Sequence, residues 1–134
     1  MERFETSTDR ASCFRQRYVP GRTEFTTHIL ALDGEPKFAT TFSFSFDCDY
    51  FVKGKQQEWA TMEITGTRYL DLFSQILRWL EFSGTCCFNY KIERGSPMIF
   101  EMNPRFGGSL CFDINSYLRA YLELLDEINI AGRS

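Results

Sequence analysis

In the segment TFSFSFDCDYF (41–51), a phenylalanine occupies every second position from residue 42 to residue 46. A repeat of two places these side chains on one face of a β-strand, so the pattern predicts a sheet with one buried face and one face in water. The preceding segment EFTTHILAL (24–32) ends at Asp33-Gly34, a dipeptide typical of hairpin turns. The two segments predict an antiparallel hairpin, and the Phe stripe belongs to its core rather than to a cofactor site.

Two helices and a second hairpin follow. From Thr67 to Ser83-Gly84 the apolar residues recur at helical spacing, and they are Tyr69, Leu70, Phe73, Ile76, Leu77 and Leu80. The second predicted helix ends before Gly132 and has Ile114, Tyr117, Leu118, Tyr121, Leu122 and Leu125 on one face. Between the helices, segments 85–92 and 97–103 flank the short connection ERGS and predict an antiparallel hairpin.

Two segments have weaker patterns. CFRQRYVPG (13–21) is typical of a short strand, and KGKQQEWATMEIT (53–65) predicts a loop with at most a short strand at its end. The order strand, strand, strand, helix, strand, strand, helix predicts an α+β fold, a mainly antiparallel sheet with two helices packed on it. Residues 1–134 fit one domain, or one lobe of a larger one.

Composition narrows the class of protein. Hydrophobic residues make up 43% of the chain and charged residues 25%, which is typical of a globular protein. The formal net charge of -3 gives no reason to expect nucleic acid as a partner, because proteins that bind it usually present a basic surface. No apolar run approaches the ~18 residues of a membrane span, and the N-terminal MERFETSTDRAS is polar. We therefore expect no membrane partner and a cytoplasmic location.

The five cysteines form an odd set, Cys13, Cys48, Cys86, Cys87 and Cys111. They contain no C-x-x-C pair and no His at metal-ligand spacing, so neither a disulfide framework nor a zinc site is predicted. Reduced thiols are the simpler interpretation. Adjacent Cys86 and Cys87 would point to opposite faces of a strand, which places one of them in the core, and neither shows the basic neighbours of a reactive thiolate.

The segment IFEMNPRFGGSL (99–110) sets polar residues into an apolar run. Because side chains two apart on a strand point the same way, Glu101, Asn103 and Arg105 would share one face, while Phe100 and Met102 face the core. A carboxylate beside an amide oxygen suits Mg²⁺, which shares its coordination shell with substrate phosphates. Arg105 would supply a planar guanidinium for the same phosphates. A surface ion pair between Glu101 and Arg105 is the alternative.

The partner strand of the hairpin extends this site. If the turn centres on Gly95, Asn89 lies opposite Glu101 and Cys87 lies opposite Asn103. Because opposed residues share a face, Asn89 and Cys87 would then both face the proposed metal.

The loop after the motif can turn sharply, because Gly107 and Gly108 tolerate positive φ. Ser109 can cap the second helix, and the N–H groups at that helix start would attract an anion. Simple helix capping and anion binding both remain open, and the two are compatible.

Two other basic groups have alternative interpretations. His28 lies in mid-strand with no acidic or cysteine neighbour at ligand spacing, which favours a structural histidine over a ligand. Lys53 and Lys55 are either solvated or, beside a nucleotide cleft, would help to hold phosphate.

FEMNPRFGGSL (100–110) resembles the E-x-N-x-R signature near the C-terminal end of ATP-grasp domains, as in carbamoyl phosphate synthetase, biotin carboxylase and D-alanine ligase-like enzymes. RYVPGRTEF (17–25) resembles the family's linker and the strand after it. LDGEPKF (32–38) and GTCCFNYKIERGSPMIFEMNPR (84–105) occur in the same order and at similar spacing as their counterparts. The resemblance covers about residues 13–125 and implies the C-terminal lobe of an ATP-grasp domain.

The resemblance implies ATP and Mg²⁺ as cofactors. Family members bind ATP between two lobes, phosphorylate a carboxylate to an acyl phosphate, and let an amine or similar nucleophile displace the phosphate. On that pattern Glu101 and Asn103 would hold Mg²⁺, with Asn89 as the candidate for a further ligand, and Arg105 would be the catalytic residue that steadies the phosphoryl groups. The remaining cofactor-binding residues would be Arg17, Val19 (adenine, through its backbone), Glu24 (ribose), Gly107, Gly108 and Ser109.

Three departures from the family pattern stand out. Arg17 occupies a position that is often Glu, and only Asn89 and Cys87 are candidates for an upstream metal ligand that is commonly an acid or Gln. Family enzymes carry two phosphate-binding lysines and a glycine-rich flap before the linker, yet the first lysine here is Lys37 and no glycine precedes Gly21. We therefore expect a single partial domain, the C-terminal half of an ATP-grasp domain without its lysine-bearing upstream lobe.

The resemblance to half of an ATP-grasp domain also predicts the activity of the chain. The isolated chain should lack ligase turnover, and the completed enzyme would act on a small-molecule carboxylate and an amine. A partner lobe or a second copy of the chain would cover exposed apolar surface. The alternative is a non-catalytic nucleotide-binding or assembly module.

Overall fold

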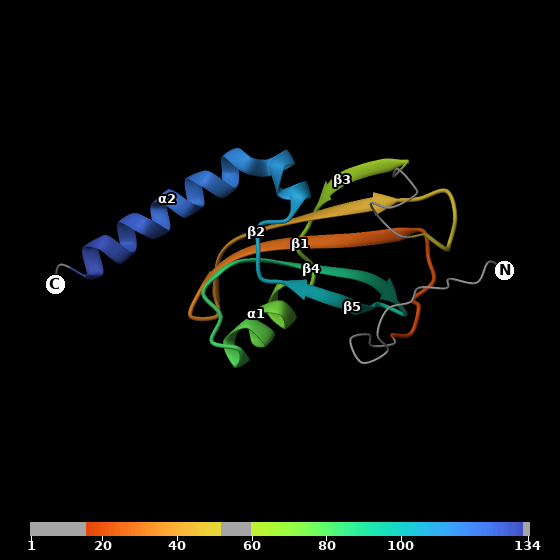
Figure 1. Cartoon of the computed structure of the whole chain (residues 1–134), viewed down its shortest axis with the longest axis horizontal. Helices are drawn as coiled ribbons and strands as arrows, with labels where there is room; N and C mark the ends of the chain where they lie inside the picture. The colour runs from red at the N-terminus through yellow and green to blue at the C-terminus, as the bar shows by residue number, and fades with distance from the viewer. Residues whose placement is uncertain (1–15, 52–59, 133–134) are drawn as a thin grey trace, which may run out of the picture.

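The computed structural model describes residues 16–51 and 60–132 and has an α+β fold, as the sequence predicts. Five strands form one sheet: β1 (Thr23–Leu32), β2 (Glu35–Ser45), β3 (Thr61–Thr65), β4 (Gly84–Glu93) and β5 (Ser96–Asn103). Their order is β3-β2-β1-β4-β5, and each neighbouring pair is antiparallel. The helices are α1 (Leu70–Trp79) and α2 (Ile114–Ala131), and the 3₁₀ helix η2 (Gly108–Asp113) leads into α2 (Figure 1).

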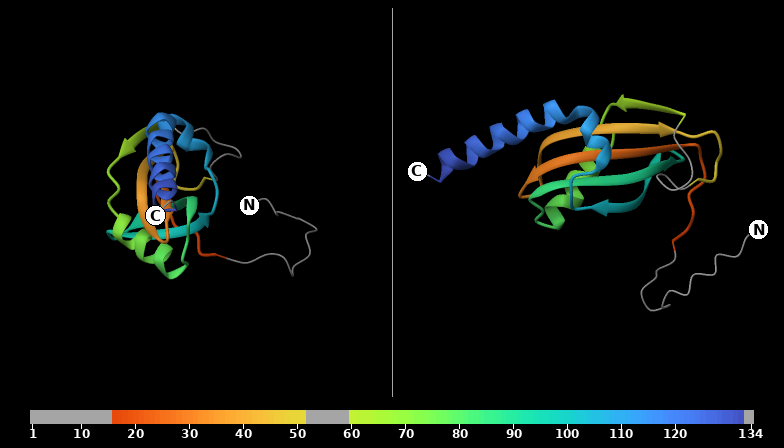
Figure 2. Two further views of the ribbon diagram at one scale, coloured as in Figure 1. Left: turned by 90° about the vertical axis from the view of Figure 1, so that its left-hand side faces the viewer. Right: turned by 45° about the horizontal axis from the view of Figure 1, so that its top comes forward.

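Helices pack on both faces of the sheet (Figures 1 and 2). In the central strand β1, Ile29 and Leu30 are both buried although adjacent side chains point to opposite faces. Ile29 packs in a cluster with Phe73 of α1, whereas Leu30 packs with Tyr117 of α2. The central strand β1 therefore contributes to two cores, one on each face of the sheet.

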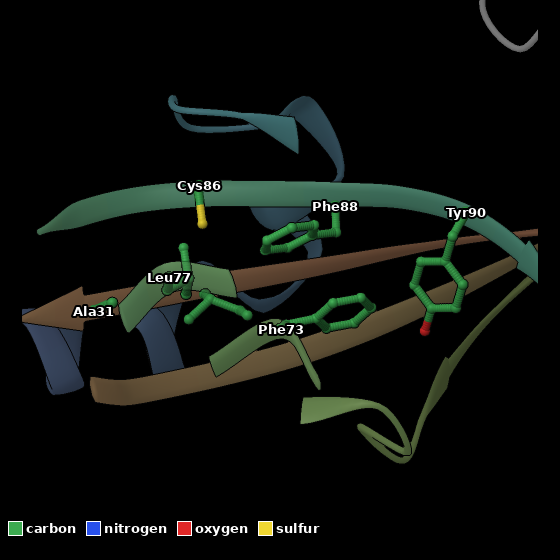
Figure 3. Packing of buried hydrophobic residues seen from close by; sticks show 7 residues of the cluster. Ala31, Phe73, Leu77, Cys86, Phe88 and Tyr90 are labelled. Atoms are coloured by element: carbon green, nitrogen blue, oxygen red, sulfur yellow. The ribbon is translucent and has the colours of Figure 1, made fainter. Parts of the chain in front are cut away.

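The core beside α1 is aromatic (Figure 3). The rings of Phe73 and Phe88 stack with centroids 4.5 Å apart and an interplanar angle of 10°. Hydrogen bonds join Thr27 Oγ1 to the Tyr90 hydroxyl (3.2 Å) and to Thr41 Oγ1 (2.8 Å), so polar side chains are buried here with partners. The expectation of a sheet with one face in water is wrong, because α1 packs on one face and α2 packs on the other.

Cys86 lies in this cluster, and burial, with Cys87 as a secondary cause, raises the pKa of its thiol to about 12. The thiol is therefore protonated at neutral pH and unreactive. Cys87 belongs to the opposite face, as expected for the next residue of a strand. Within the described residues, Cys48, Cys86, Cys87 and Cys111 form no disulfide.

The predicted strand 13–21 is wrong where the structure describes it, since residues 16–21 form no strand, and its first residues lie outside the described part. This segment is attached to β4 by a side chain instead of a backbone ladder. Lys91 Nζ donates a hydrogen bond to the Val19 carbonyl at 2.9 Å.

Other predictions differ from the structure mainly at their boundaries. β2 begins at Glu35, directly after the turn, and ends at Ser45, whereas the alternation predicted 41–51. The short strand at the end of 53–65 is confirmed as β3, while Lys53 and Lys55 lie outside the described residues. Both helices are confirmed, and within the described chain neither is long and apolar enough to cross a membrane.

The β4–β5 hairpin has one additional residue in β5. A two-residue turn leaves Glu93 opposite Ser96, and the register continues to Tyr90 opposite Ile99. The register then shifts by one residue, which leaves Phe100 as a β-bulge.

Beyond the bulge, Asn89 lies opposite Glu101 and Cys87 lies opposite Asn103, so the predicted pairing is confirmed. The bulge produces this pairing, not a turn centred on Gly95. Gln16 Nε2 donates a hydrogen bond to the carbonyl of the bulged residue Phe100 at 3.1 Å. This bond gives a partner to a backbone group at the point where the strand pairing is interrupted.

We expect Phe73→Ala to lower the free energy of unfolding by about 3–5 kcal/mol, because it removes a fully buried ring and leaves a cavity. Trp79→Ala on the same helix is the matched control: its side chain is 83% exposed, so the change should be within about 0.5 kcal/mol. Urea unfolding measures both. Equal losses in the two variants would contradict the assignment of the core to this face of α1.

Candidate functional site

Two amide side chains hold Glu101 on β5. Asn89 Nδ2 donates to Glu101 Oε1 at 2.7 Å, and Asn103 Nδ2 donates to the same oxygen at 2.9 Å. From β1, Thr26 Oγ1 donates to Asn89 Oδ1 at 2.8 Å, which fixes the orientation of that amide. The hydrogen bonds form a chain across three neighbouring strands, from buried Thr26 to exposed Glu101.

These side chains line a cavity of about 480 Å³. The loop after β5 contributes Arg105, Gly107, Gly108 and Ser109 to its wall. Every described residue that was predicted to bind metal or phosphate therefore borders one space. Phe44 of the Phe stripe is buried, as predicted, yet it also lines this cavity.

Arg105 reaches the cavity from the loop and not from the strand. β5 ends at Asn103, and Arg105 N donates to the Asn103 carbonyl at 2.8 Å. Its Nη1 donates to the Phe106 carbonyl at 3.3 Å. Within the described residues no ion pair joins Glu101 and Arg105, so the alternative of a surface ion pair is not formed.

Gly107 is required by close packing. Its φ is -92°, and neither Gly107 nor Gly108 has positive φ, so the predicted reason for these glycines is wrong. A Cβ on Gly107 would lie 2.6 Å from His28 Cε1 and 3.2 Å from Cys87 Sγ. A Cβ on Gly108 would meet nothing within 4 Å.

Ser109 does not cap the second helix, so that prediction is wrong. α2 begins at Ile114 without a side-chain cap, because η2 lies between it and the loop. A hydrogen bond of 2.8 Å instead joins Ser109 Oγ to His28 Nε2 and attaches the loop to β1. His28 is fully buried, as a structural histidine would be, but Cys87 lies opposite it on β4, a neighbour that the sequence did not reveal.

A second cavity, of about 330 Å³, shares Asn89 and Glu101 with the first. It contains the three residues predicted for the nucleoside, Arg17, Val19 and Glu24. Val19 and Glu24 are buried. The Arg17 guanidinium is exposed and pairs with Glu93 (Nη2 to Oε2, 2.8 Å), and this pair lowers the pKa of Glu93 and raises that of Arg17.

Sequence reasoning missed five residues of the second cavity, which are Gln16, Tyr18, Phe51, Lys91 and Phe100. Phe100 was expected in the core, and the bulge places it in the cavity wall instead. Lys91 is buried and also lines the cavity. Its place could have been inferred, because it lies two residues from Asn89 on the same strand and therefore shares its face.

Among the described residues that line the first cavity, Glu101 is the only carboxylate. Within the described chain, no group of three or more His, Cys, Asp or Glu side chains is placed to hold a metal ion. The Asn89 oxygen already accepts a hydrogen bond from Thr26, which leaves Glu101 and Asn103 as the better oxygen donors. Because Mg²⁺ with nucleotides commonly uses one or two carboxylates plus phosphate oxygens, these residues fit a magnesium–nucleotide complex better than a free ion.

Comparison with known proteins adds no assignment, since no family model, curated protein or solved structure matches the chain. The class of protein that the fold and site define is an α+β domain with two adjoining cavities on one face of an antiparallel sheet. A chain of hydrogen bonds ending in one carboxylate separates these cavities.

We expect Gly107→Ala to lower the free energy of unfolding by about 1–3 kcal/mol, because the added methyl group overlaps His28 and must displace the loop. Gly108→Ala, one residue away in open space, should change it by no more than about 0.5 kcal/mol. Urea unfolding of both proteins makes the comparison. A neutral Gly107→Ala would show that the loop does not pack on β1 as described.

Proposed function

We propose that this chain is the nucleotide- and magnesium-binding half of an ATP-grasp ligase. The observation that supports this best is the shared wall of the two cavities. Residues assigned to the nucleoside by the family resemblance line one cavity, and those assigned to metal and phosphate line the other. Asn89 and Glu101 border both, so a nucleotide could extend from Val19 and Glu24 past the carboxylate.

Mg²⁺ would be held by Glu101 and Asn103 together with phosphate oxygens. Asn89 would orient the carboxylate through its hydrogen bond to Glu101, as Thr26 orients Asn89. Arg105, whose guanidinium is exposed in the cavity wall, would neutralise charge on the transferred phosphoryl group. Gly107, Gly108 and Ser109 would form the loop beside the phosphates.

The proposed reaction is activation of a carboxylate as an acyl phosphate, followed by attack of an amine or similar nucleophile. Positioning and charge neutralisation supply most of the catalysis of phosphoryl transfer. ATP-grasp enzymes grip the outer phosphates from a second, lysine-bearing lobe, so turnover is proposed for this half joined to such a lobe. We propose the cytoplasm as its location.

The test uses calorimetry to measure the affinity of the 134-residue chain for ATP with and without Mg²⁺. Wild type should bind ATP more tightly with Mg²⁺. Glu101→Gln keeps an oxygen that can accept the two amide hydrogen bonds but removes the charge. It should therefore weaken magnesium-dependent binding roughly tenfold or more, the usual worth of an interaction with a charged group.

Glu63→Gln is the matched control, because Glu63 lies opposite Ser43 and so belongs to the other face of the sheet. It should bind as wild type does. Absence of ATP binding by wild type, or Glu101→Gln binding that equals it, would refute the proposed site.

A second candidate function is self-assembly through α2. Only Tyr117 and Leu124 of this helix are buried, and its C-terminal part extends beyond the strands (Figures 1 and 2). The exposed apolar residues of this helix include Leu118, Tyr121, Leu122, Leu125 and Ile128. Four of them are spaced three, four and three residues apart, the repeat of paired helices.

A second copy of the chain is the proposed occupant of this surface. Its own α2 presents an identical row of apolar side chains at the same spacing, so the two rows can pack against each other.

We expect wild type to sediment as a concentration-dependent dimer and Leu125→Glu to sediment as a monomer, because the new carboxylate would be buried among the row of Leu118, Tyr121, Leu125 and Ile128. Ser116→Glu adds the same charge at an exposed position outside the row and should remain dimeric. A wild type that stays monomeric at every concentration, or equal effects of the two substitutions, would exclude this assembly.

A further inference from the structure

We propose that Lys91 reads the nucleobase, by donating a hydrogen bond to a ring nitrogen of a purine that carries an amino group beside it. This inference rests on the proposed nucleotide site and specifies its ligand. The resemblance to ATP-grasp domains assigns no role to Lys91.

Lys91 is only 3% exposed, although lysine is almost never fully buried without a partner charge. Its Nζ donates to the Val19 carbonyl at 2.9 Å and to the Tyr18 hydroxyl at 3.4 Å. The Nζ also lies 4.3 Å from the ring centroid of Phe51 and 4.9 Å from that of Tyr18. Within the described residues it forms no ion pair with a carboxylate.

An ammonium group has three donors and no acceptor. One strong hydrogen bond, one long one and two aromatic faces leave this cation with less stabilisation than water would give it. A ligand that brings an acceptor into the second cavity would supply the missing hydrogen bond. Lys91 is in the wall of that cavity, so such a ligand can reach it.

The surroundings of Lys91 indicate a base rather than a phosphate. Tyr18, Phe51 and Phe100 line the same cavity and provide aromatic surface for a planar ring. Arg105 and the glycine loop, the proposed phosphate contacts, line the other cavity. The volume of about 330 Å³ is within the range of small-molecule pockets.

The hydrogen-bonding groups determine which edge of a base would fit. The Val19 carbonyl accepts and Lys91 Nζ donates, and the two atoms are 2.9 Å apart. Their complement is a donor beside an acceptor, as in an exocyclic amino group next to a ring nitrogen. Adenine presents this pair on both sides of its amino group, through N1 and through N7.

The experiment measures binding of ATP, 1-deaza-ATP, 7-deaza-ATP and inorganic triphosphate, all with Mg²⁺, to the full chain. Wild type should bind one of the deaza analogues roughly tenfold or more weakly than ATP, because that analogue lacks the nitrogen that accepts from a charged donor. Lys91→Met, which keeps an unbranched chain, should bind ATP at the weakened level and should not distinguish the analogues. Triphosphate should bind both proteins equally.

Lys37→Met is the matched control, because Lys37 pairs with Glu127 of α2 and is not in the wall of either cavity; it should behave as wild type. If wild type binds neither ATP nor triphosphate, the proposed function itself fails, and the role of Lys91 fails with it. If wild type binds ATP and both deaza analogues with equal affinity, the proposed role of Lys91 is wrong, while the proposed nucleotide site stands. That result needs no variant to fold. Equal weakening of ATP and triphosphate by Lys91→Met would assign Lys91 to phosphate and overturn base reading.

Discussion

One additional residue in β5 decides which side chains face the cavities. If the register of the turn continued without a bulge, Glu101 would lie opposite Phe88 and point into the core beside Phe73. A carboxylate there would be desolvated among aromatic rings, which is strongly unfavourable. The bulge at Phe100 instead moves Glu101 to the face of Asn89, where two amide groups donate to it. The difference in solvation between these two environments favours the shifted register.

The central strand β1 connects this carboxylate to the loop that follows it. Thr26 and His28 are buried polar residues on the cavity face of β1, and each bonds to a different part of the site. Thr26 supports Asn89, and His28 bonds to Ser109. Because buried polar groups require partners, these two bonds fix the positions of the strand edge and of the loop together.

The sequence-based predictions succeeded where short-range periodicity controls the outcome. The two hairpins and both helices follow from patterns within a few residues of each other, whereas the pairing of Asn89 with Glu101, though predicted, arises from the bulge at Phe100. Predictions failed where a distant residue intervenes. A side chain at position 107 would overlap His28, which is far away in sequence. The same histidine forms a hydrogen bond with the Ser109 hydroxyl that was expected to cap a helix.

The amino-acid sequence by itself determined the α+β class and the spacing that places an acid and an amide on one strand face, because these depend on repeats of two and on helical spacing. The tertiary structure alone decided that both faces of the sheet are covered, that Phe100 leaves the core and that Lys91 is enclosed by Tyr18 and Phe51. Those outcomes depend on contacts between segments distant in sequence, and the balance of burial and hydrogen bonding that selects them exists only once the chain has folded.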